Sequence, residues 1–240
     1  MDDPLLDLWR LVGVPSGLEA ARSAADAVLR DRGLRAVPPA ERARALLHGA
    51  AASAELAAGD PLAPGEPRRD WRAGAVRVST QLGELAPLVR GAPGQALTRV
   101  HTLLARGVLP DAQVGRVRPE VADRVLELTR LLGRRSAAPS LLTAAVAHAE
   151  VATLLPFAAG NGVVARALEH LVLVADGVDP VGVLVPEAGH RDAAVDYRRA
   201  LAGYATGSLG GVRDWLLHVA RALAAGAETT DRLRRAPGAG

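Results

Sequence analysis

The sequence predicts an all-helical fold, and three observations support the prediction. Hydrophobic residues make up 49% of the 240 residues, which is enough apolar material for one or two buried cores. Aromatic residues make up only 2%, so leucine, valine and alanine must fill the core, and alanine is the strongest helix former. Apolar residues also recur with helical spacing in successive segments that end at glycine or proline.

The first 92 residues are predicted to form an N-terminal helical extension. Glycine and proline breaks separate three stretches of helical periodicity, over residues 4–12, 18–32 and 40–58. The segment 61–69 follows them and contains three prolines and one glycine. We therefore expect this segment to be a linker or an exposed loop.

Residues 93–228 are predicted to form the compact core, and residues 229–240 a flexible tail. The helices expected after the linker span 76–89, 95–106, 119–132, 139–154, 163–175, 188–204 and 210–225. Residues 108–118 combine turn residues with a short alternation of valine and arginine. This pattern is compatible with a short β-hairpin that forms a flap beside a site.

Composition excludes several classes of function. Cysteine is absent, which excludes disulfides, thiolate zinc sites and cysteine nucleophiles. The acidic start is unlike a secretory signal, and charged residues or glycine interrupt every apolar run, so we expect a cytoplasmic protein that does not span a membrane. All 29 basic residues are arginine, but they alternate with acidic residues and the net charge is only +3, so no nucleic-acid partner is expected.

The most informative segment is the loop between the helices predicted at 139–154 and 163–175. Pro156 cannot continue the first helix. Gly160-Asn161-Gly162 tolerates positive φ, which allows successive backbone amides to point into one concavity where the next helix begins. These amides and the helix dipole favour phosphate, and Arg166, one turn into the helix, could fork onto phosphate oxygens. A tight interhelical turn, with Arg166 in an ordinary ion pair, is the alternative.

The same segment resembles the signature of Fic (Fido) proteins, which reads His-Pro-Phe, any residue, Asp or Glu, Gly-Asn-Gly-Arg, any two residues, Arg. The signature residues present without a gap are Pro156, Phe157, Gly160, Asn161, Gly162 and Arg166. The similarity covers roughly 95–205: His148 lies in a similar preceding helix, residues 190–201 resemble the family's Asn-Arg and Tyr-x-x-Ala-Leu helix, and residues 106–118 lie where the family has its substrate-docking flap. The resemblance implies a Fic-like helical fold.

Three departures from the signature bear on activity. Fic proteins use the signature histidine as the base that takes a proton from a target hydroxyl, while a nucleoside triphosphate donates a nucleotidyl group, most often adenylyl. Leu155 stands at that position and has no titratable proton. Ala159 replaces the acidic residue that holds the metal, and Val163 replaces the first signature arginine. The resemblance thus implies a protein that is not a conventional Fic AMP-transferase.

Residues 50–58 resemble the helix by which many Fic proteins restrain themselves, whose motif is Ser or Thr, three residues, Glu, then Gly or Asn. Ser53 matches, but Ala57 stands where the glutamate would pair with the second signature arginine. Glu55 is displaced by two positions and would face another side of the helix. This alignment implies that the catalytic histidine and the restraining glutamate were lost together. An ordinary alanine-rich helix is the alternative.

No other residue is expected to replace the missing base. His148 lies about two turns, or about ten ångström, before Leu155, so it cannot reach the same proton and is expected to be structural. The remaining candidate histidines are scattered, without the spacing of a metal pair: His101, His170, His190 and His218. Motifs of serine hydrolases, P-loop NTPases and dinucleotide-binding enzymes are absent. We therefore predict no catalytic residue and no metal site.

These observations predict a degenerate Fic protein, a pseudoenzyme that binds a phosphate-bearing ligand through Gly160, Asn161, Gly162 and Arg166. An ATP-like nucleotide is the expected ligand, and magnesium is not expected. Two alternatives stay open: a transferase with altered chemistry, whose target or ligand supplies the base, and a helical interaction module with a vestigial loop. Each is compatible with a protein partner or a homo-oligomer. The arginine- and alanine-rich composition favours a bacterial origin.

Overall fold

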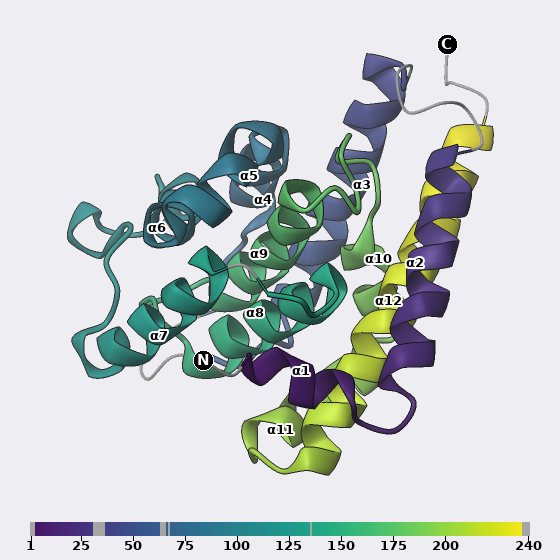
Figure 1. Ribbon diagram of the computed structural model, residues 1–240. Coiled ribbons are helices and arrows are strands. Elements are labelled where there is room, and N and C mark those ends of the chain that lie inside the picture. The colour runs from purple at the N-terminus through teal and green to yellow at the C-terminus, as the bar shows by residue number, and fades with distance from the viewer. Residues whose placement is uncertain (1–2, 31–36, 63–65, 67, 135, 237–240) are drawn as a thin grey trace.

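The computed structural model describes residues 3–30, 37–62, 66, 68–134 and 136–236. Every regular element in this part of the chain is a helix, and it contains no strand (Figure 1). The predicted all-helical fold is therefore confirmed. None of the described helices is both long and apolar enough to cross a membrane.

The part of the chain described before residue 92 contains the helices α1 (Pro4–Trp9), α2 (Val14–Arg30), α3 (Pro39–Ala57), α4 (Arg72–Thr80) and α5 (Leu82–Gly91). The sequence predicted one helix over 76–89, but the chain leaves the helical conformation at Gln81, where φ is −105° and ψ is 9°. This break separates α4, which packs on α3, from α5, which packs on the later helix α9.

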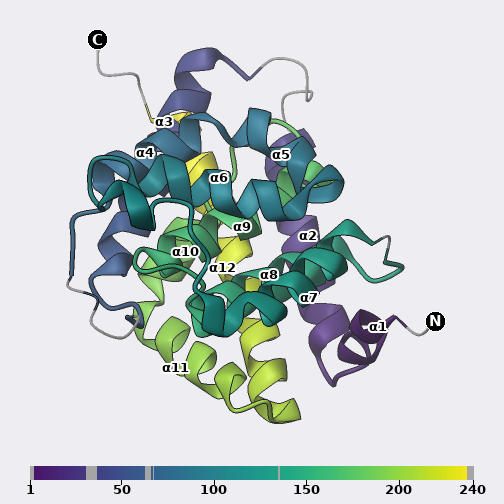
Figure 2. The ribbon, with the colours of Figure 1, turned by 90° about the vertical axis from the view of Figure 1, so that its left-hand side faces the viewer.

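The helices that follow are α6 (Pro93–Ala105), α7 (Ala122–Gly133), α8 (Ser140–Leu154), α9 (Asn161–Ala175), α10 (Pro186–Asp192), α11 (Ala194–Ala205) and α12 (Leu209–Arg235). α8 and α9 lie side by side at the centre of the molecule (Figures 1 and 2). All side chains of residues 141–149 and 161–173 are buried, because other helices surround this pair. The loop between α8 and α9 therefore lies deep in the fold.

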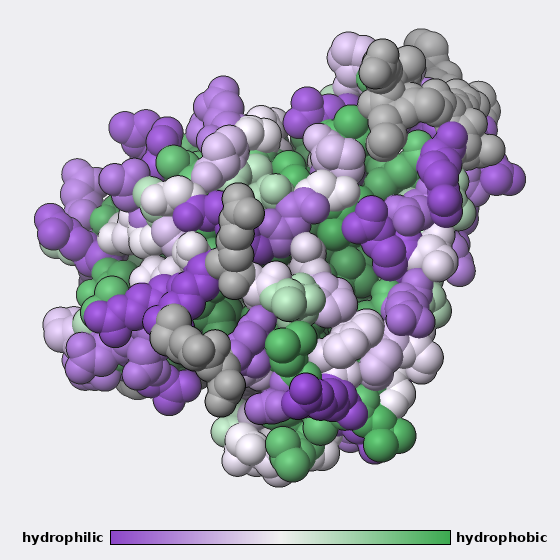
Figure 3. Space-filling view, in the orientation of Figure 1, coloured by the Kyte–Doolittle hydropathy of each residue, from purple (hydrophilic) through white to green (hydrophobic). Residues whose placement is uncertain are grey.

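The N-terminal helices share one hydrophobic core with the rest of the described chain. Buried apolar residues from Leu5 to Ala227 form a continuous cluster. α2 runs along α12, so helices from the two ends of the chain pack together (Figure 1). On the face seen in Figure 3, polar and apolar residues are interspersed, in keeping with the mixed charge pattern of the sequence.

Glycines allow α10 and α12 to approach very closely. A Cβ atom added at Gly189 in α10 would lie 1.9 Å from the carbonyl oxygen of Ala222 in α12. A Cβ atom at Gly226 in α12 would lie 2.6 Å from the carbonyl oxygen of Val185, just before α10. Since no side chain fits at these distances, only glycine permits this backbone contact. The contact brings His190 of α10 and His218 of α12 together in the core.

The β-hairpin considered for residues 108–118 is not formed. Regular structure near it is limited to an isolated bridge between Arg106 and Leu109 and to the single-turn 3₁₀ helix η1 (Asp111–Gln113). The backbone amide of Gly115 donates to His101 of α6, and that of Arg118 donates to the carbonyl of Pro156. These amides are bonded to other parts of the fold, so they are not available for cross-strand pairing.

The flexible tail predicted over 229–240 is helical in its first part. α12 continues to Arg235, and Thr229 and Thr230 are buried. The hydroxyl of Thr230 donates to the carbonyl of Val183, which ties this last stretch of helix to the segment before α10. Residues 237–240 lie outside the described part of the chain. Packing against neighbouring segments therefore extends the helix about ten residues beyond its predicted end at residue 225.

Candidate functional site

The loop between α8 and α9 has the predicted helix-loop-helix form. α8 ends at Leu155, which adopts the left-handed conformation with φ 51°, and Pro156 directs the chain away from the helix. Gly160 precedes α9 with φ 77°, a conformation that favours glycine. Among the described residues, Leu155 is the only one other than glycine with positive φ. The position that aligns with the histidine of the Fic signature is thus occupied by an apolar residue in a strained backbone conformation.

The side chain of Asn161 holds the loop closed. Its Oδ1 accepts a hydrogen bond from the amide of Phe157 at 2.8 Å, and its Nδ2 donates to the carbonyl of the same residue at 2.9 Å. Asn161 and Phe157 are both buried. The amide side chain is therefore committed to the loop itself, and any ligand would meet the backbone of this residue.

The ring of His101, in α6, packs against the loop. Its ring stacks on Phe157 with centroids 4.0 Å apart, and Nε2 lies 3.2 Å from the carbonyl of Ala159. Nδ1 accepts from the amide of Gly115 at 2.8 Å. Burial lowers the pKa of His101 to about 4, so the ring is neutral at pH 7. This neutral ring joins the 108–118 segment to the signature loop.

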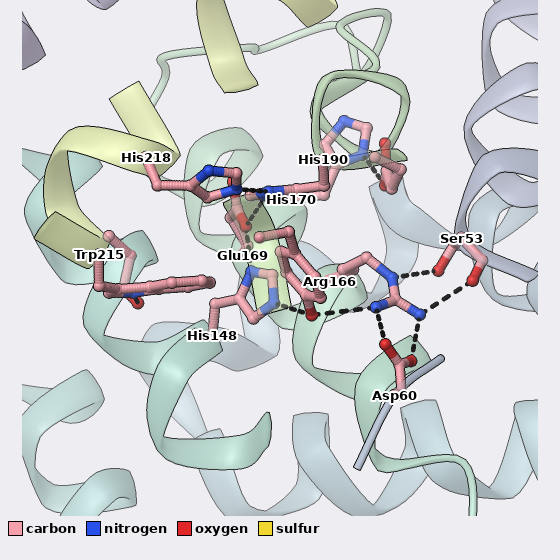
Figure 4. Close-up of polar contacts among 12 residues, drawn as sticks. Ser53, Asp60, His148, Arg166, Glu169, His170, His190, Trp215 and His218 are labelled. Carbon is pink, nitrogen blue, oxygen red and sulfur yellow. Dashed lines mark hydrogen bonds and ion pairs between the residues drawn. The ribbon is translucent and has the colours of Figure 1, made fainter. Parts of the chain in front are cut away.

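Arg166 lies in the core and has all five N–H donors engaged by the protein (Figure 4). Nη1 and Nη2 donate to the two carboxylate oxygens of Asp60 at 3.1 and 2.8 Å. Nε donates to the hydroxyl of Ser53 and Nη2 to its carbonyl, both at 2.9 Å, and Nη1 donates to the hydroxyl of Tyr197 at 3.1 Å. Although burial alone would lower the pKa of Arg166, Asp60 raises it above its ordinary value.

Two carboxylates lie at the predicted phosphate site. A Cβ atom added at Gly162 would lie only 1.9 Å from Oδ2 of Asp60, so this carboxylate rests directly on the glycine. Oε1 of Glu66 accepts a hydrogen bond from the amide of Gly160 at 3.0 Å. The space that remains between this segment and the loop has a volume of about 10 Å³. It has room for about one water molecule, so a nucleotide requires displacement of the segment.

The segment 61–69 was predicted to be a linker or an exposed loop, and one of its residues contacts the candidate site. Glu66 accepts a hydrogen bond from Gly160 in the α8–α9 loop, and Asp60, just before the segment, pairs with Arg166 in α9. The described residues of 61–69 form no helix or strand, as predicted. Described residues of the segment, such as Leu62 and Glu66, therefore line the site, and residues 63–65 and 67 lie outside the described part of the chain.

The helix that resembles the restraining helix lies against Arg166, as the alignment implied. Ser53 of α3 contacts the guanidinium, whereas Glu55 is half-exposed and lies 3.5 Å from Arg191. Asp60, which lies between the helix predicted over 40–58 and the segment 61–69 and was not predicted as a site residue, pairs with the arginine. It follows Ala57 by three residues, about one helical turn, and this spacing was the signal that could have revealed it.

The residues at the other two lost signature positions are packed in the interior. Ala159 and Val163 are buried, and Leu155 is half-buried. His148 is also buried, and its ring faces α9 and α11. The side chains of Leu155, Ala159 and Val163 contain no titratable or metal-ligating atom.

A larger polar cluster lies behind Arg166, and sequence reasoning missed it. Its members come from five helices, α8 to α12: His148, Glu169, His190, Tyr197 and His218 (Figure 4). Oε2 of Glu169 contacts Nδ1 of His148 and lies 2.9 Å from Nε2 of His190. Metal-binding pairs are recognised in a sequence by a spacing of three or four residues, whereas these residues lie on different helices. Glu169 follows Arg166 by one turn, which is the only local indication.

The electrostatics of this cluster follow from burial. Burial lowers the pKa of His148 to about 4 and that of His218 to about 3, so both rings are neutral at pH 7. Although burial alone would raise the pKa of Glu169, the neighbouring His190 and His148 lower it below its usual range. The cluster thus contains a carboxylate in the core of the protein.

The buried His170, outside this cluster, has a different environment. Nδ1 of His170 lies 3.0 Å from Glu187 and Nε2 lies 3.2 Å from Asp179. Although burial opposes the charged form, Glu187 and Asp179 raise the pKa of His170 to about 10. His170 is therefore a buried imidazolium between two carboxylates, and its charge is compensated within the fold.

Known structures share this architecture. A Fic family protein from Desulfovibrio desulfuricans G20 matches with a TM-score of 0.62 and 19% identity, over 92% of this chain and 76% of that chain. A fragment of Fic-1 from C. elegans matches with a TM-score of 0.61 and 18% identity, over 92% and 73% of the two chains. A glutamate-to-glycine variant of that fragment gives a TM-score of 0.66 and 18% identity, over 91% and 72%. The chain therefore has the fold of Fic proteins, as the signature implied.

The comparisons by sequence give no match. No family model matches the chain, and no curated protein matches it. The similarity to Fic proteins is therefore one of fold and of the short signature.

Proposed function

We propose that this chain is a non-catalytic Fic-fold protein that binds a phosphate-bearing ligand, an ATP-like nucleotide, at the α8–α9 loop. The backbone amides of Gly160, Asn161 and Gly162 and the guanidinium of Arg166 would receive the phosphates. The observation that carries the proposal is that the chain's own carboxylates, from Asp60 and Glu66, already lie at this site. A site that binds carboxylates through backbone amides and a guanidinium is selective for anions.

Binding is expected to be an exchange of anions. A phosphate group presents the same kind of acceptor oxygens as the carboxylate of Asp60, with more of them and more charge. It could take over the two N–H groups of Arg166 that face Asp60, while Ser53 and Tyr197 keep their contacts with the guanidinium. The ligand would thereby release Asp60 and Glu66 from the site, and a protein partner could recognise this change.

The absence of conventional transfer chemistry is part of the proposal. Leu155 supplies no base, and Ala159 supplies no oxygen to magnesium. His148 is fully buried and bonded to Glu169 and Tyr197, so it is not available to a target hydroxyl. The alternative of a transferase would need a base from the target or ligand. A cytoplasmic location and a bacterial origin belong to the same proposal.

A second candidate is favoured by one observation. All five donors of Arg166 have partners within the protein, as in a purely structural ion pair. In that case the loop is vestigial, and the protein is a helical interaction module that binds no phosphate.

Thermal unfolding with a panel of ligands separates the two candidates. ATP, GTP, AMP and pyrophosphate, with and without magnesium, are added to the wild-type protein and to the double variant Asp60→Asn/Glu66→Gln. We expect at least one ligand to raise the Tm, to raise it more in the double variant, and to need no magnesium. Glu55→Gln is the control, because Glu55 is an acidic residue of α3 that does not contact the loop. A folded double variant whose Tm no ligand changes would favour the vestigial loop.

A further inference from the structure

The cluster behind the signature loop brings two imidazoles and one carboxylate together from three helices. His148 lies on α8, Glu169 on α9 and His190 on α10, and each is at most 1% exposed. One ligand atom from each residue lies within 4.8 Å of those of the other two.

The carboxylate in the cluster is incompletely satisfied. Oε2 of Glu169 accepts from both imidazoles, but Oε1 is buried and has no hydrogen-bond partner. Arg166, the cation that borders the cluster through Tyr197, is already paired with Asp60. A buried carboxylate oxygen without a partner is unfavourable, and a bound cation that this oxygen coordinates would correct the defect.

We propose that His148, Glu169 and His190 bind one divalent first-row transition ion, with zinc as the reference ion. Two imidazoles and a carboxylate are a common donor set for zinc and for other ions of this series. A modest movement of the three side chains would replace the hydrogen bonds between them by metal–ligand bonds of about 2.0–2.2 Å. Oε1 of Glu169 would supply the fourth donor, so the site would be closed to water.

The surroundings of the two imidazoles fit this role. Nε2 of His148 lies 3.0 Å from the hydroxyl of Tyr197, and Nδ1 of His190 lies 3.0 Å from Nε2 of His218. Metal-binding imidazoles usually have the second nitrogen fixed by such a partner, which selects the tautomer. Trp215 packs edge-on to His148, with ring centroids 4.9 Å apart, and is stacked with His190 at 6.2 Å. Its indole therefore excludes solvent and is a spectroscopic probe beside the site.

The chain also contains a matched control. His170 contacts two buried carboxylates, but Glu187 lies on Nδ1 and Asp179 on Nε2, at opposite nitrogens of the ring. One ion cannot bind both carboxylates and one ring nitrogen in that arrangement. His170 is expected to stay protonated and to bind no metal.

The test is the metal content of the full chain. The protein is produced in zinc-supplemented medium, dialysed against a weak chelator and analysed for metal by mass spectrometry. It is then unfolded with chelator and refolded with Zn²⁺ or Co²⁺, because the ligands are too deeply buried for rapid exchange. We expect one ion per chain, a higher Tm than that of the metal-free protein, and, with Co²⁺, visible absorption and quenched fluorescence of Trp215.

The variants assign the ion to the cluster. His148→Gln and His190→Gln are expected to lose the ion, the cobalt absorption and the metal-dependent rise in Tm. His170→Gln and the half-buried His48→Gln are expected to retain all three. Wild-type protein that stays metal-free after refolding overturns the proposal, as does equal metal content in wild type and in a folded cluster variant. If neither cluster variant folds, absence of the cobalt absorption and fluorescence quenching in the wild type decides against the site.

Discussion

At the scale of single residues, the main finding is that Arg166 is both a signature residue and an internal ion-pair partner. A guanidinium that is 1% exposed needs its counter-charge and its acceptors within the fold. The sequence predicted the loop that precedes this arginine. The structure adds the groups that its guanidinium contacts. Asp60 was not predicted as a partner of Arg166, because the two lie 106 residues apart and only the spacing of Asp60 from Ala57 points to it.

Arg166→Ala is expected to lower the free energy of unfolding by about 3–5 kcal/mol, because it leaves the carboxylate of Asp60 buried without a cation. Urea denaturation measures this change. Arg199→Ala is the control, since Arg199 pairs with Asp196 at the surface, and such pairs contribute about 0–1 kcal/mol. Equal effects of the two substitutions would mean that the buried pair is not formed.

Gly162→Ala tests the position of the Asp60 carboxylate. The new methyl group would lie 1.9 Å from Oδ2 of Asp60, so the carboxylate must move and we expect a loss of about 1–3 kcal/mol of stability. Gly91→Ala is the control, because nothing lies within 4 Å of its added Cβ and alanine restricts the unfolded chain. A Gly162→Ala protein as stable as wild type would place Asp60 elsewhere.

At the scale of elements, helical periodicity located the helices well and their ends less well. The predicted helix over 188–204 is two helices, α10 and α11, and the break lies at Ala193. Alanine is a strong helix former, so nothing local marks this break. The extension of α12 to Arg235 depends equally on tertiary contacts, which the sequence pattern does not contain.

The contact between α10 and α12 depends on glycine. Gly189→Ala is expected to destabilise the protein by about 1–3 kcal/mol or more, because the methyl group meets the backbone of Ala222, which cannot rotate away as a side chain can. Thermal unfolding should show a clearly lower Tm. Gly210→Ala, in the first turn of α12 with open space around it, should leave the Tm unchanged or slightly higher. The reverse order of the two Tm values would contradict this packing.

His101 connects α6, the 108–118 segment and the signature loop, and its protonation should be visible in the stability. Its pKa is about 4 in the folded protein and 6.5 ordinarily, so the unfolded chain takes up the proton first as the pH falls. This group therefore contributes stability above pH 6.5 that is lost between pH 6.5 and about 4, on the order of 3 kcal/mol.

Denaturation of wild type and His101→Gln across this pH range measures the effect. The variant should be less stable at pH 7, and the difference between the two proteins should narrow toward pH 4. A constant difference across the range would show that His101 is protonated in the folded state.

At the scale of the whole molecule, side chains from many elements meet behind one loop. The hydrogen-bonded series runs from Asp60 through Arg166 and Tyr197 to the histidine cluster (Figure 4). The hydrophobic core could be predicted because it depends on the amino-acid composition and on the helical spacing of the apolar residues. The site could be predicted only where the residues are contiguous, as in Gly160-Asn161-Gly162, because the other groups meet through helix packing. For the same reason, the spacing rules for metal ligands did not find Glu169 and its histidines.

We propose that the carboxylate of Asp60 occupies an anion site that a phosphate-bearing ligand can take. The most direct measurement of this exchange is calorimetric titration of ATP, without magnesium, into wild type, Asp60→Asn and Arg166→Ala, each first shown to be folded. We expect weak binding to wild type, binding at least tenfold tighter to Asp60→Asn because the competing charge is removed, and none to Arg166→Ala. Absence of binding to a folded Asp60→Asn protein at millimolar ATP would contradict the proposed anion exchange, and the loop would then be a structural remnant of the fold.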